Sequence, residues 1–88
     1  MATQTQSKAA FEQAVIDLIA AILERRGVSV VVAPDTELFE GRLIDSVSFA
    51  ELLGAIEAEL DVEVPDHMLS TEHFRTPAII ARTFAPGS

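Results

Sequence analysis

Few side chains in this sequence can do covalent chemistry, and the hydroxyl of Ser46 is the most suggestive of them. The chain has 88 residues, no cysteine and two histidines, which excludes disulfides, thiolate nucleophiles and cysteine metal sites. Ser46 stands between Asp45 and Val47, at the start of a segment whose apolar residues recur at helical spacing. Any sulfur chemistry would therefore need a thiol supplied by a cofactor.

A serine at the start of a helix has two interpretations. Most such serines are N-caps, whose side chain accepts a hydrogen bond from a free backbone N–H, and we expect this of Ser46. A modified serine is the alternative, because a phosphodiester there would lie beside free N–H groups and the positive end of the helix dipole. The two interpretations are compatible, so capping alone does not decide between them. Ser48 is a rival hydroxyl slightly further into the helix.

The two histidines offer a weaker site. His67 and His73 are six residues apart and lack a cysteine or a convincing frame of carboxylates, so we expect surface or capping histidines and no metal. Two histidines in a short connection do not support a Ser/His/Asp triad, and no glycine-rich phosphate loop is present.

Three helical segments must position these side chains. A helix is expected over residues 8–26, with arginines in its last turn and Gly27 as C-cap, and a second over 46–60. About one helical turn is expected within 66–75, and Thr76-Pro77 should begin a last helix that runs to Phe84. The expected buried stripes are Phe11, Ala14, Val15, Leu18, Ile19, Ile22 and Leu23 in the first helix, Phe49, Leu52, Leu53, Ile56 and Leu60 in the second, and Ile79, Ile80 and Phe84 in the last.

The connection between the first two helices is long. Residues 28–32 are β-branched enough for a strand, yet no second strand is apparent for pairing. We expect an ordered loop whose valines pack onto the helices, with Leu38 and Phe39 inserted into the core. The predicted fold class is therefore all-α, a bundle of three main helices plus one short helix with a long first loop. The expected organisation is one domain over 8–85, with a flexible N-terminal tail over 1–7 and a C-terminal tail over 86–88.

The charge restricts the partners. Fourteen acidic and six basic residues give a formal charge of −8, which repels nucleic acid and favours basic surfaces. Without a signal-peptide pattern or an apolar run long enough to span a bilayer, we expect a cytoplasmic monomer that neither binds nucleic acid nor inserts into membranes.

The run Asp45-Ser46-Val47 resembles the Asp-Ser-Leu signature of acyl carrier and peptidyl (aminoacyl) carrier proteins, with valine in place of leucine. The resemblance covers roughly residues 8–85. Its other elements are the loop segments Asp35-Thr36-Glu37-Leu38-Phe39 and Gly41-Arg42-Leu43-Ile44, the acidic second helix with its exit through Asp61, Glu63, Val64, Pro65 and Asp66, and the entry Phe74-Arg75-Thr76-Pro77 to the last helix.

This resemblance implies a non-catalytic carrier with an acyl-carrier-protein-like fold. A phosphopantetheinyl transferase would attach 4'-phosphopantetheine from coenzyme A to Ser46, between the flanking residues Asp45 and Val47, and the arm would carry a substrate as a thioester. The metal of that reaction belongs to the transferase. Val47 still offers the transferase an apolar contact, but a smaller one than the leucine of the signature would offer.

The resemblance also implies partners. Glu51, Glu57 and Glu59, with Asp45, would meet basic patches on an acyl- or aminoacyl-activating ligase and on a downstream transferase or synthase. The Leu-Ile-Asp-Ser form and the Phe-x-Thr-Pro stretch look more like stand-alone aminoacyl, D-alanyl or secondary-metabolite carriers than the fatty-acid carrier. The alternatives are an unmodified helical module that docks on a basic partner through its acidic second helix and, more remotely, a small hydrolase.

Overall fold

The computed structural model of the chain describes residues 8–85 and confirms the all-α class. Its elements are α1 (Lys8–Arg25), α2 (Ser46–Leu60), the 3-10 helices η1 (Asp66–Met68) and η2 (Thr71–Phe74), and α3 (Pro77–Phe84), with no strand among the described residues. The single helical turn expected over 66–75 is thus two short 3-10 segments. The tails expected over 1–7 and 86–88 lie outside the described residues, and the domain over 8–85 stays a prediction.

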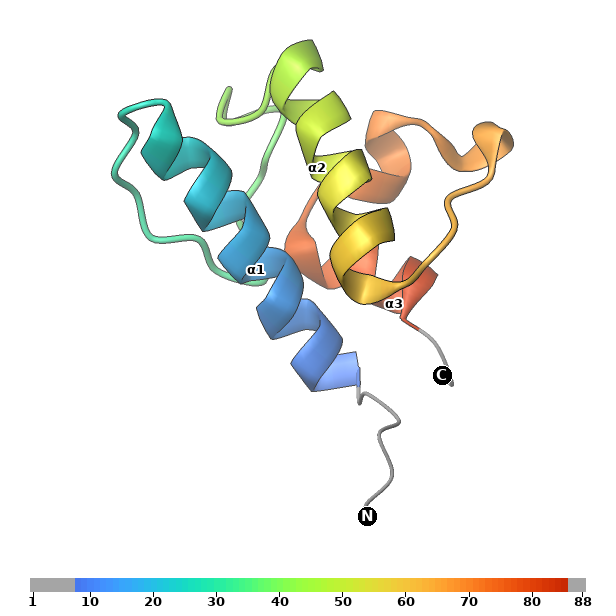
Figure 1. Cartoon of the computed structure of the whole chain (residues 1–88). Coiled ribbons are helices and arrows are strands. Elements are labelled where there is room, and N and C mark those ends of the chain that lie inside the picture. Colours follow the sequence, from blue (N-terminus) through green and yellow to red (C-terminus); the bar gives the residue numbers. More distant parts are fainter. Residues whose placement is uncertain (1–7, 86–88) are drawn as a thin grey trace.

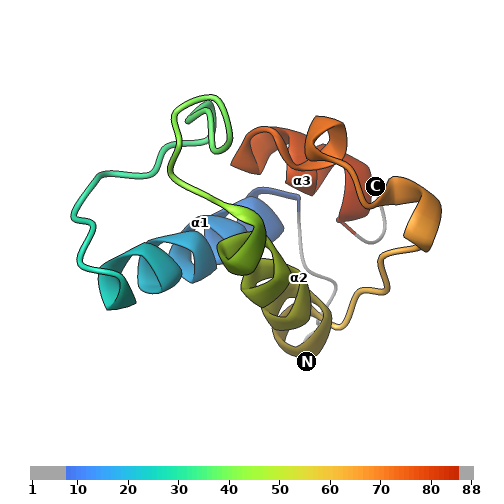
Figure 2. The ribbon, with the colours of Figure 1, turned by 90° about the horizontal axis from the view of Figure 1, so that it is seen from above.

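The helices enclose one core beneath the long first loop. α1 contacts both α2 and α3, and α3 also contacts η2. Figure 1 shows α1 and α2 in front of α3, and the view from above in Figure 2 shows the first loop running back along α1 before it enters α2. This path brings the start of α2 close to the end of α1.

The buried stripes agree with the sequence pattern in part. In α1, Ile16 is buried although the pattern omitted it, whereas Leu18 is only half-buried. In α2 the fully buried positions are Ser48, Leu52 and Ile56. The predicted positions Phe49, Leu53 and Leu60 are half-buried and pack against the core from its edge. The apolar face of α2 is wide, so its periodicity does not show which line of residues points to the centre.

Aromatic rings form a continuous row through the core. Phe39 and Phe49 lie 5.4 Å apart between ring centroids, Phe49 and Phe74 5.0 Å, and Phe74 and Phe84 5.1 Å. Separations of this size are favourable for aromatic pairs. The row joins the first loop, α2, η2 and α3, and it explains why the half-buried face of α2 remains important for packing.

The end of α1 follows its sequence signals closely. Gly27 has a φ of 80°, which is the left-handed region that glycine adopts without strain. The Val28 N–H donates to the Leu23 carbonyl at 2.9 Å and the Gly27 N–H to the Glu24 carbonyl at 3.0 Å. These bonds close the last turn as a glycine C-cap does, and the helix ends at Arg25, one residue earlier than predicted.

The prediction that the valines of the first loop pack onto the helices is wrong for most of them. Val32 is buried, but Val31 is 88% exposed and Val28 and Val30 are about two-fifths exposed, at 39% and 41%. The loop lies over the outer side of α1, where alanines provide little apolar cover. Leu38, by contrast, is fully buried as predicted, while its neighbour Phe39 is half-buried.

We expect Leu52→Ala to lower the free energy of unfolding by about 2–5 kcal/mol, because it removes a fully buried side chain from the centre of the core. Leu69→Ala is the matched control: that leucine is 43% exposed, and its truncation should change stability by no more than about 0.5 kcal/mol. Urea unfolding followed by circular dichroism measures both. Equal losses in the two variants would contradict the placement of Leu52.

Candidate functional site

Ser46 is the exposed first residue of α2, and it is not the N-cap. The cap is Asp45, which has extended backbone angles and whose Oδ1 accepts the Ser48 N–H at 2.8 Å. The prediction that Ser46 caps the helix is therefore wrong by one position. Because a carboxylate already fills the capping role, the Ser46 hydroxyl is left free for another use.

The rival hydroxyl is not accessible. The Ser48 side chain is 1% exposed and hydrogen-bonds to the Asp45 carboxylate. It therefore belongs to the capping arrangement and faces the core. Of the two serines in this turn, only Ser46 presents its side chain to solvent.

A tight turn in the first loop aims the chain into α2. The Leu38 carbonyl accepts the N–H groups of both Leu43 and Ile44 at 3.0 Å. Inside this turn, Gly41 has no room for a side chain, because a Cβ there would lie 2.6 Å from the Glu37 carbonyl oxygen. Arg42 completes the turn in the left-handed region, with a φ of 61°.

The same loop is fixed to the far side of the bundle. The Arg75 guanidinium donates to both carboxylate oxygens of Glu37 at 2.9 Å, which is the bidentate geometry that gives charged hydrogen bonds their specificity. The Leu38 N–H donates to the Arg75 carbonyl, and the Ala78 N–H donates to the Pro34 carbonyl at 2.9 Å. Contacts with η2 and α3 thus help to place the beginning of α2.

The start of α2 suits an added negative charge. The Ser46 and Val47 N–H groups have no hydrogen-bond acceptor within residues 8–85, as is usual in the first turn of a helix, and the helix dipole is positive there. The Ser48 backbone N–H, then its side chain, hold the pKa of Asp45 below its ordinary value of 3.8, with a smaller contribution from Arg26.

Two arginines from the end of α1 also approach this site. Arg26 lies 3.8 Å from Asp45 Oδ2 and 3.7 Å from Glu51 Oε1, and Arg25 lies 3.3 Å from Glu51 Oε2. No pattern in the sequence associates these arginines with Ser46. Arg25 ends α1 and Arg26 follows it directly, but their approach to α2 depends on how the long loop folds back.

The three predicted partner-binding glutamates differ in their surroundings. Glu51 is paired with Arg25 and Arg26, although its side chain remains 43% exposed. Glu57 Oε2 accepts the Val64 N–H at 2.9 Å and so fixes the exit from α2. Glu59 is exposed, with no ion pair to another residue of 8–85. Val47, the apolar neighbour of Ser46, is 62% exposed.

The histidines lie away from this site, in η1 and η2. His73 Nδ1 is 3.0 Å from the Ser70 hydroxyl, and His67 is exposed. Within the described part of the chain, no three metal-ligating side chains come together. None of the helices over 8–85 has the length and apolar character that crossing a membrane requires.

Comparisons with known proteins agree on one family. A family model described as "Phosphopantetheine attachment site" matches residues 13–84. The D-alanyl carrier protein of Bacillus velezensis is 36% identical over 67 residues, which cover 76% of this chain and 83% of that protein. The D-alanyl carrier protein of Bacillus subtilis is 37% identical over the same shares.

A solved structure supports the same relationship. The crystal structure of Bradyrhizobium japonicum glycine:[carrier protein] ligase complexed with glycylated carrier protein contains a chain that superposes with a TM-score of 0.67. The sequences are 25% identical, and the match covers 81% of this chain and 95% of that chain. The likeness therefore extends over nearly all of the described helices.

We expect Asp45→Asn to destabilise the protein in a pH-dependent way. An asparagine oxygen can still cap α2, so the variant isolates the carboxylate charge. Because the pKa of Asp45 is lowered by folding, the charge stabilises the protein fully above its unfolded pKa of 3.8, and this contribution is lost as pH falls through the folded pKa.

The measurement is urea unfolding of both proteins from neutral to acidic pH. Their free energies of unfolding should differ most above pH 3.8 and converge below it. A difference that stays constant down to the lowest pH would show that the charge of Asp45 is not what stabilises the helix start.

Proposed function

This chain belongs to the family of phosphopantetheine-attachment carrier proteins, and we propose that the Ser46 hydroxyl is the atom to which its 4'-phosphopantetheine is joined. One observation supports this choice above the others: Ser46 is the exposed hydroxyl at the start of α2, and the neighbouring Asp45 has taken over the capping role. Ser48, the other hydroxyl of this turn, is buried.

The residues around Ser46 fit such a group. A phosphodiester on Ser46 would lie beside the free N–H groups of the first turn, where anions are favoured. Arg26, 3.8 Å from the adjacent carboxylate of Asp45, offsets the repulsion between that carboxylate and the new charge. When attached, the group supplies a terminal thiol on which an acyl or aminoacyl cargo is held as a thioester.

The attachment step uses a single atom of this chain. The Ser46 oxygen forms a bond to the pantetheine-side phosphorus of coenzyme A, while the pyrophosphate bond breaks and the adenosine bisphosphate leaves. The hydroxyl proton passes to a base on the phosphopantetheinyl transferase, which also holds the metal. Val47, 62% exposed, offers an apolar contact to that enzyme.

The chain's own role is to present its cargo, and it catalyses no reaction. A tethered cargo has a raised effective concentration at each partner's site. The partners are the transferase, an activating ligase, and a downstream transferase or synthase with a basic docking patch, all met in the cytoplasm by a monomeric carrier. Glu59 offers such a patch a free carboxylate, whereas Glu51 and Glu57 must share theirs with internal contacts.

A small amino acid is the cargo that the comparisons favour. Two relatives are D-alanyl carrier proteins, and the similar solved structure holds a glycylated carrier protein with its ligase. We therefore propose that an ATP-dependent ligase activates an amino acid such as alanine or glycine as its adenylate, with release of pyrophosphate, and then transfers it to the thiol, with release of AMP.

We expect the purified chain to gain the mass of phosphopantetheine when it is incubated with coenzyme A, Mg²⁺ and a broad-specificity transferase. Ser46→Ala should gain nothing, because the accepting oxygen is absent. Intact-protein mass spectrometry measures the change.

Ser48→Ala is the matched control, since it removes the buried hydroxyl and keeps the backbone N–H that Asp45 accepts. It should be modified at a rate close to that of the unchanged protein. Modification that persists in Ser46→Ala would move the site elsewhere, and no modification by any of several transferases would contradict the proposal.

We expect the modified protein to accept D-alanine or glycine from the corresponding purified ligases with ATP, because two relatives are named D-alanyl carrier proteins and the similar solved structure pairs a glycylated carrier protein with a glycine ligase. The added mass should disappear after treatment with hydroxylamine, which cleaves thioesters. Loading by an acyl-activating ligase with a fatty acid, and by neither amino-acid ligase, would show that the cargo is of another class.

A further inference from the structure

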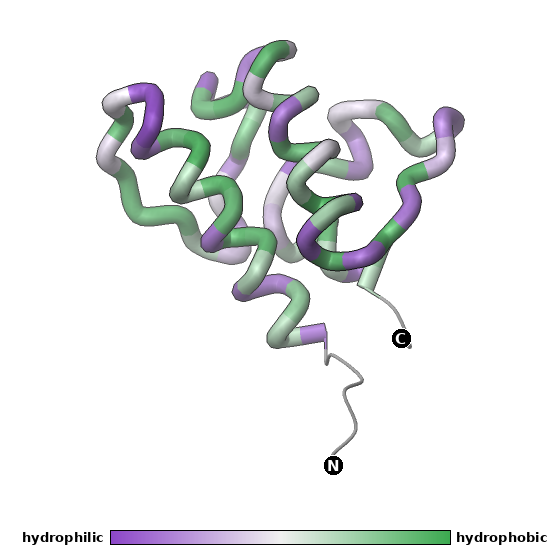
Figure 3. Tube along the Cα trace, viewed as in Figure 1, coloured by the Kyte–Doolittle hydropathy of each residue, from purple (hydrophilic) through white to green (hydrophobic). Residues whose placement is uncertain are grey.

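The first loop carries an extended apolar segment, Val28–Val32, on the outside of α1. Exposure alternates along its last three residues: Val30 is 41% exposed, Val31 88% and Val32 9%. This alternation is typical of a strand, whose successive side chains point to opposite sides. Figure 3 shows the segment as a hydrophobic stretch that runs beside α1.

The backbone of this segment is unpaired. The N–H and C=O groups of Ser29, Val30, Val31 and Val32 make no hydrogen bond with any residue of 8–85. β-Branched residues with free backbone groups form the kind of edge onto which another strand can pair. The devices that usually prevent such pairing, a charged side chain or a proline within the segment, are missing from residues 28–32.

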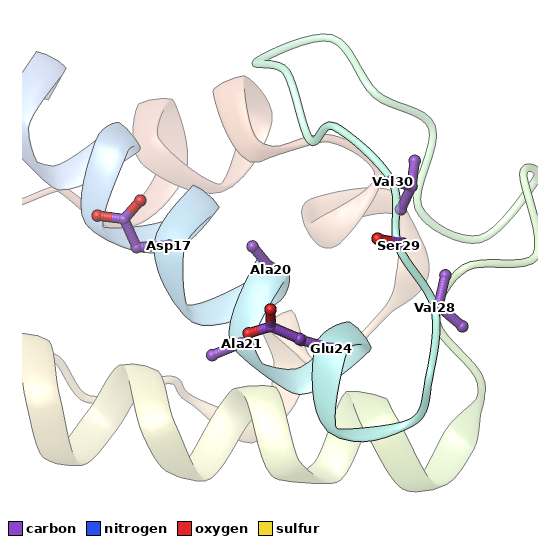
Figure 4. Close-up of a pocket in the computed structure, with 7 residues that line it drawn as sticks. All are labelled: Asp17, Ala20, Ala21, Glu24, Val28, Ser29 and Val30. Carbon is purple, nitrogen blue, oxygen red and sulfur yellow. The ribbon is translucent and has the colours of Figure 1, made fainter.

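A groove lies between this segment and α1. It has a volume of about 270 Å³ and is lined by Asp17, Ala20, Ala21, Glu24, Val28, Ser29 and Val30. Figure 4 shows the two small alanine side chains on α1 across from the segment, with the carboxylates of Asp17 and Glu24 on the same helix. The groove therefore has a mixed lining, in which small apolar side chains lie beside two carboxylates and polar backbone.

We propose that this groove and the edge of residues 29–32 bind an extended basic segment of a partner protein. The partner's backbone would pair with the free N–H and C=O groups, in the manner of strand addition. One of its apolar side chains would enter the groove between Ala20 and Val30, and its Lys or Arg side chains would face Asp17 and Glu24.

Charge favours such a partner over a second copy of this chain. Each chain carries a formal charge of −8, so two copies repel one another. Two copies would also bring together like carboxylates from Asp17 and Glu24. A basic segment relieves both conflicts, and its attraction to the chain speeds encounter.

This binding face is separate from the proposed attachment at Ser46 and does not depend on it. The groove lies on α1 and the early part of the loop, whereas Ser46 opens α2. A partner held at residues 29–32 therefore leaves the exposed serine free to be presented elsewhere.

The test uses the unmodified full chain and two blocked pentapeptides as probes, one alternating Lys with Val and the other alternating Glu with Val. With the Lys peptide at about ten times its dissociation constant, the amide hydrogens of alternate residues within 29–32, whose N–H groups face the added strand, should exchange about tenfold more slowly. Amide NMR signals of residues 20–24 should shift in the same titration. The Glu peptide should cause neither change.

Two substitutions in the groove test whether the slowed amide exchange is caused by peptide bound there. Val30→Asp places a charge on its apolar wall, and Ala21→Gln fills its floor with a neutral side chain that suits a helix; each should abolish the slowing. Leu69→Asp is the matched control, because Leu69 is 43% exposed and is not part of the groove. It should leave peptide binding unchanged.

Three outcomes would overturn the proposal: no slowing at millimolar Lys peptide, equal effects of the two peptides, or slowing that survives in both groove variants. If amide exchange slows as the protein concentration rises in the absence of peptide, the edge pairs with a second copy of this chain. That result would also overturn the proposal. If Val30→Asp fails to fold, Ala21→Gln decides, since Ala21 is an exposed helix residue.

Discussion

The geometry of the start of α2 depends on one buried residue, Leu38. Its side chain is fully enclosed in the core, its carbonyl accepts the N–H groups of Leu43 and Ile44, and its own N–H donates to the Arg75 carbonyl. Side chain and backbone thus hold the loop at the same place, and buried backbone groups are costly to leave unpaired. The loop consequently enters α2 at a fixed angle, with Asp45 positioned to cap the helix.

At the start of α2, two neighbouring residues have different roles: one caps the helix, and the other has a hydroxyl exposed to solvent. Asp45 satisfies the first turn with its carboxylate, while Ser46 keeps its oxygen in solvent. Arg25 and Arg26 then balance the acidic side chains of this turn. These exposed ion pairs contribute little to stability, so their main effect is on the electrostatic field around the serine. A basic partner accordingly meets less free negative charge at Glu51 than the sequence suggests.

The sequence predicts most of this fold because its local signals are strong. Helical spacing defines α2 to the residue, Thr76-Pro77 marks the start of α3, and Gly27 marks the end of α1. Capping at Ser46 was misplaced because aspartate and serine cap about equally well, and only the backbone angles distinguish adjacent candidates. The ion pairs of Arg25 and Arg26 and the exposure of Val31 depend on the path of the loop, which no local pattern specifies.

The bonds from Glu37 and Leu38 to Arg75, and from Pro34 to Ala78, join the first loop to the segment around the start of α3, far along the chain from it. The bonds from Leu43 and Ile44 to Leu38 lie within the loop itself, whereas the bonds to Arg75 and Ala78 require the segment that follows α2. Residues near the start of α3 therefore contribute to the surroundings of Ser46, although they lie far from it in the sequence.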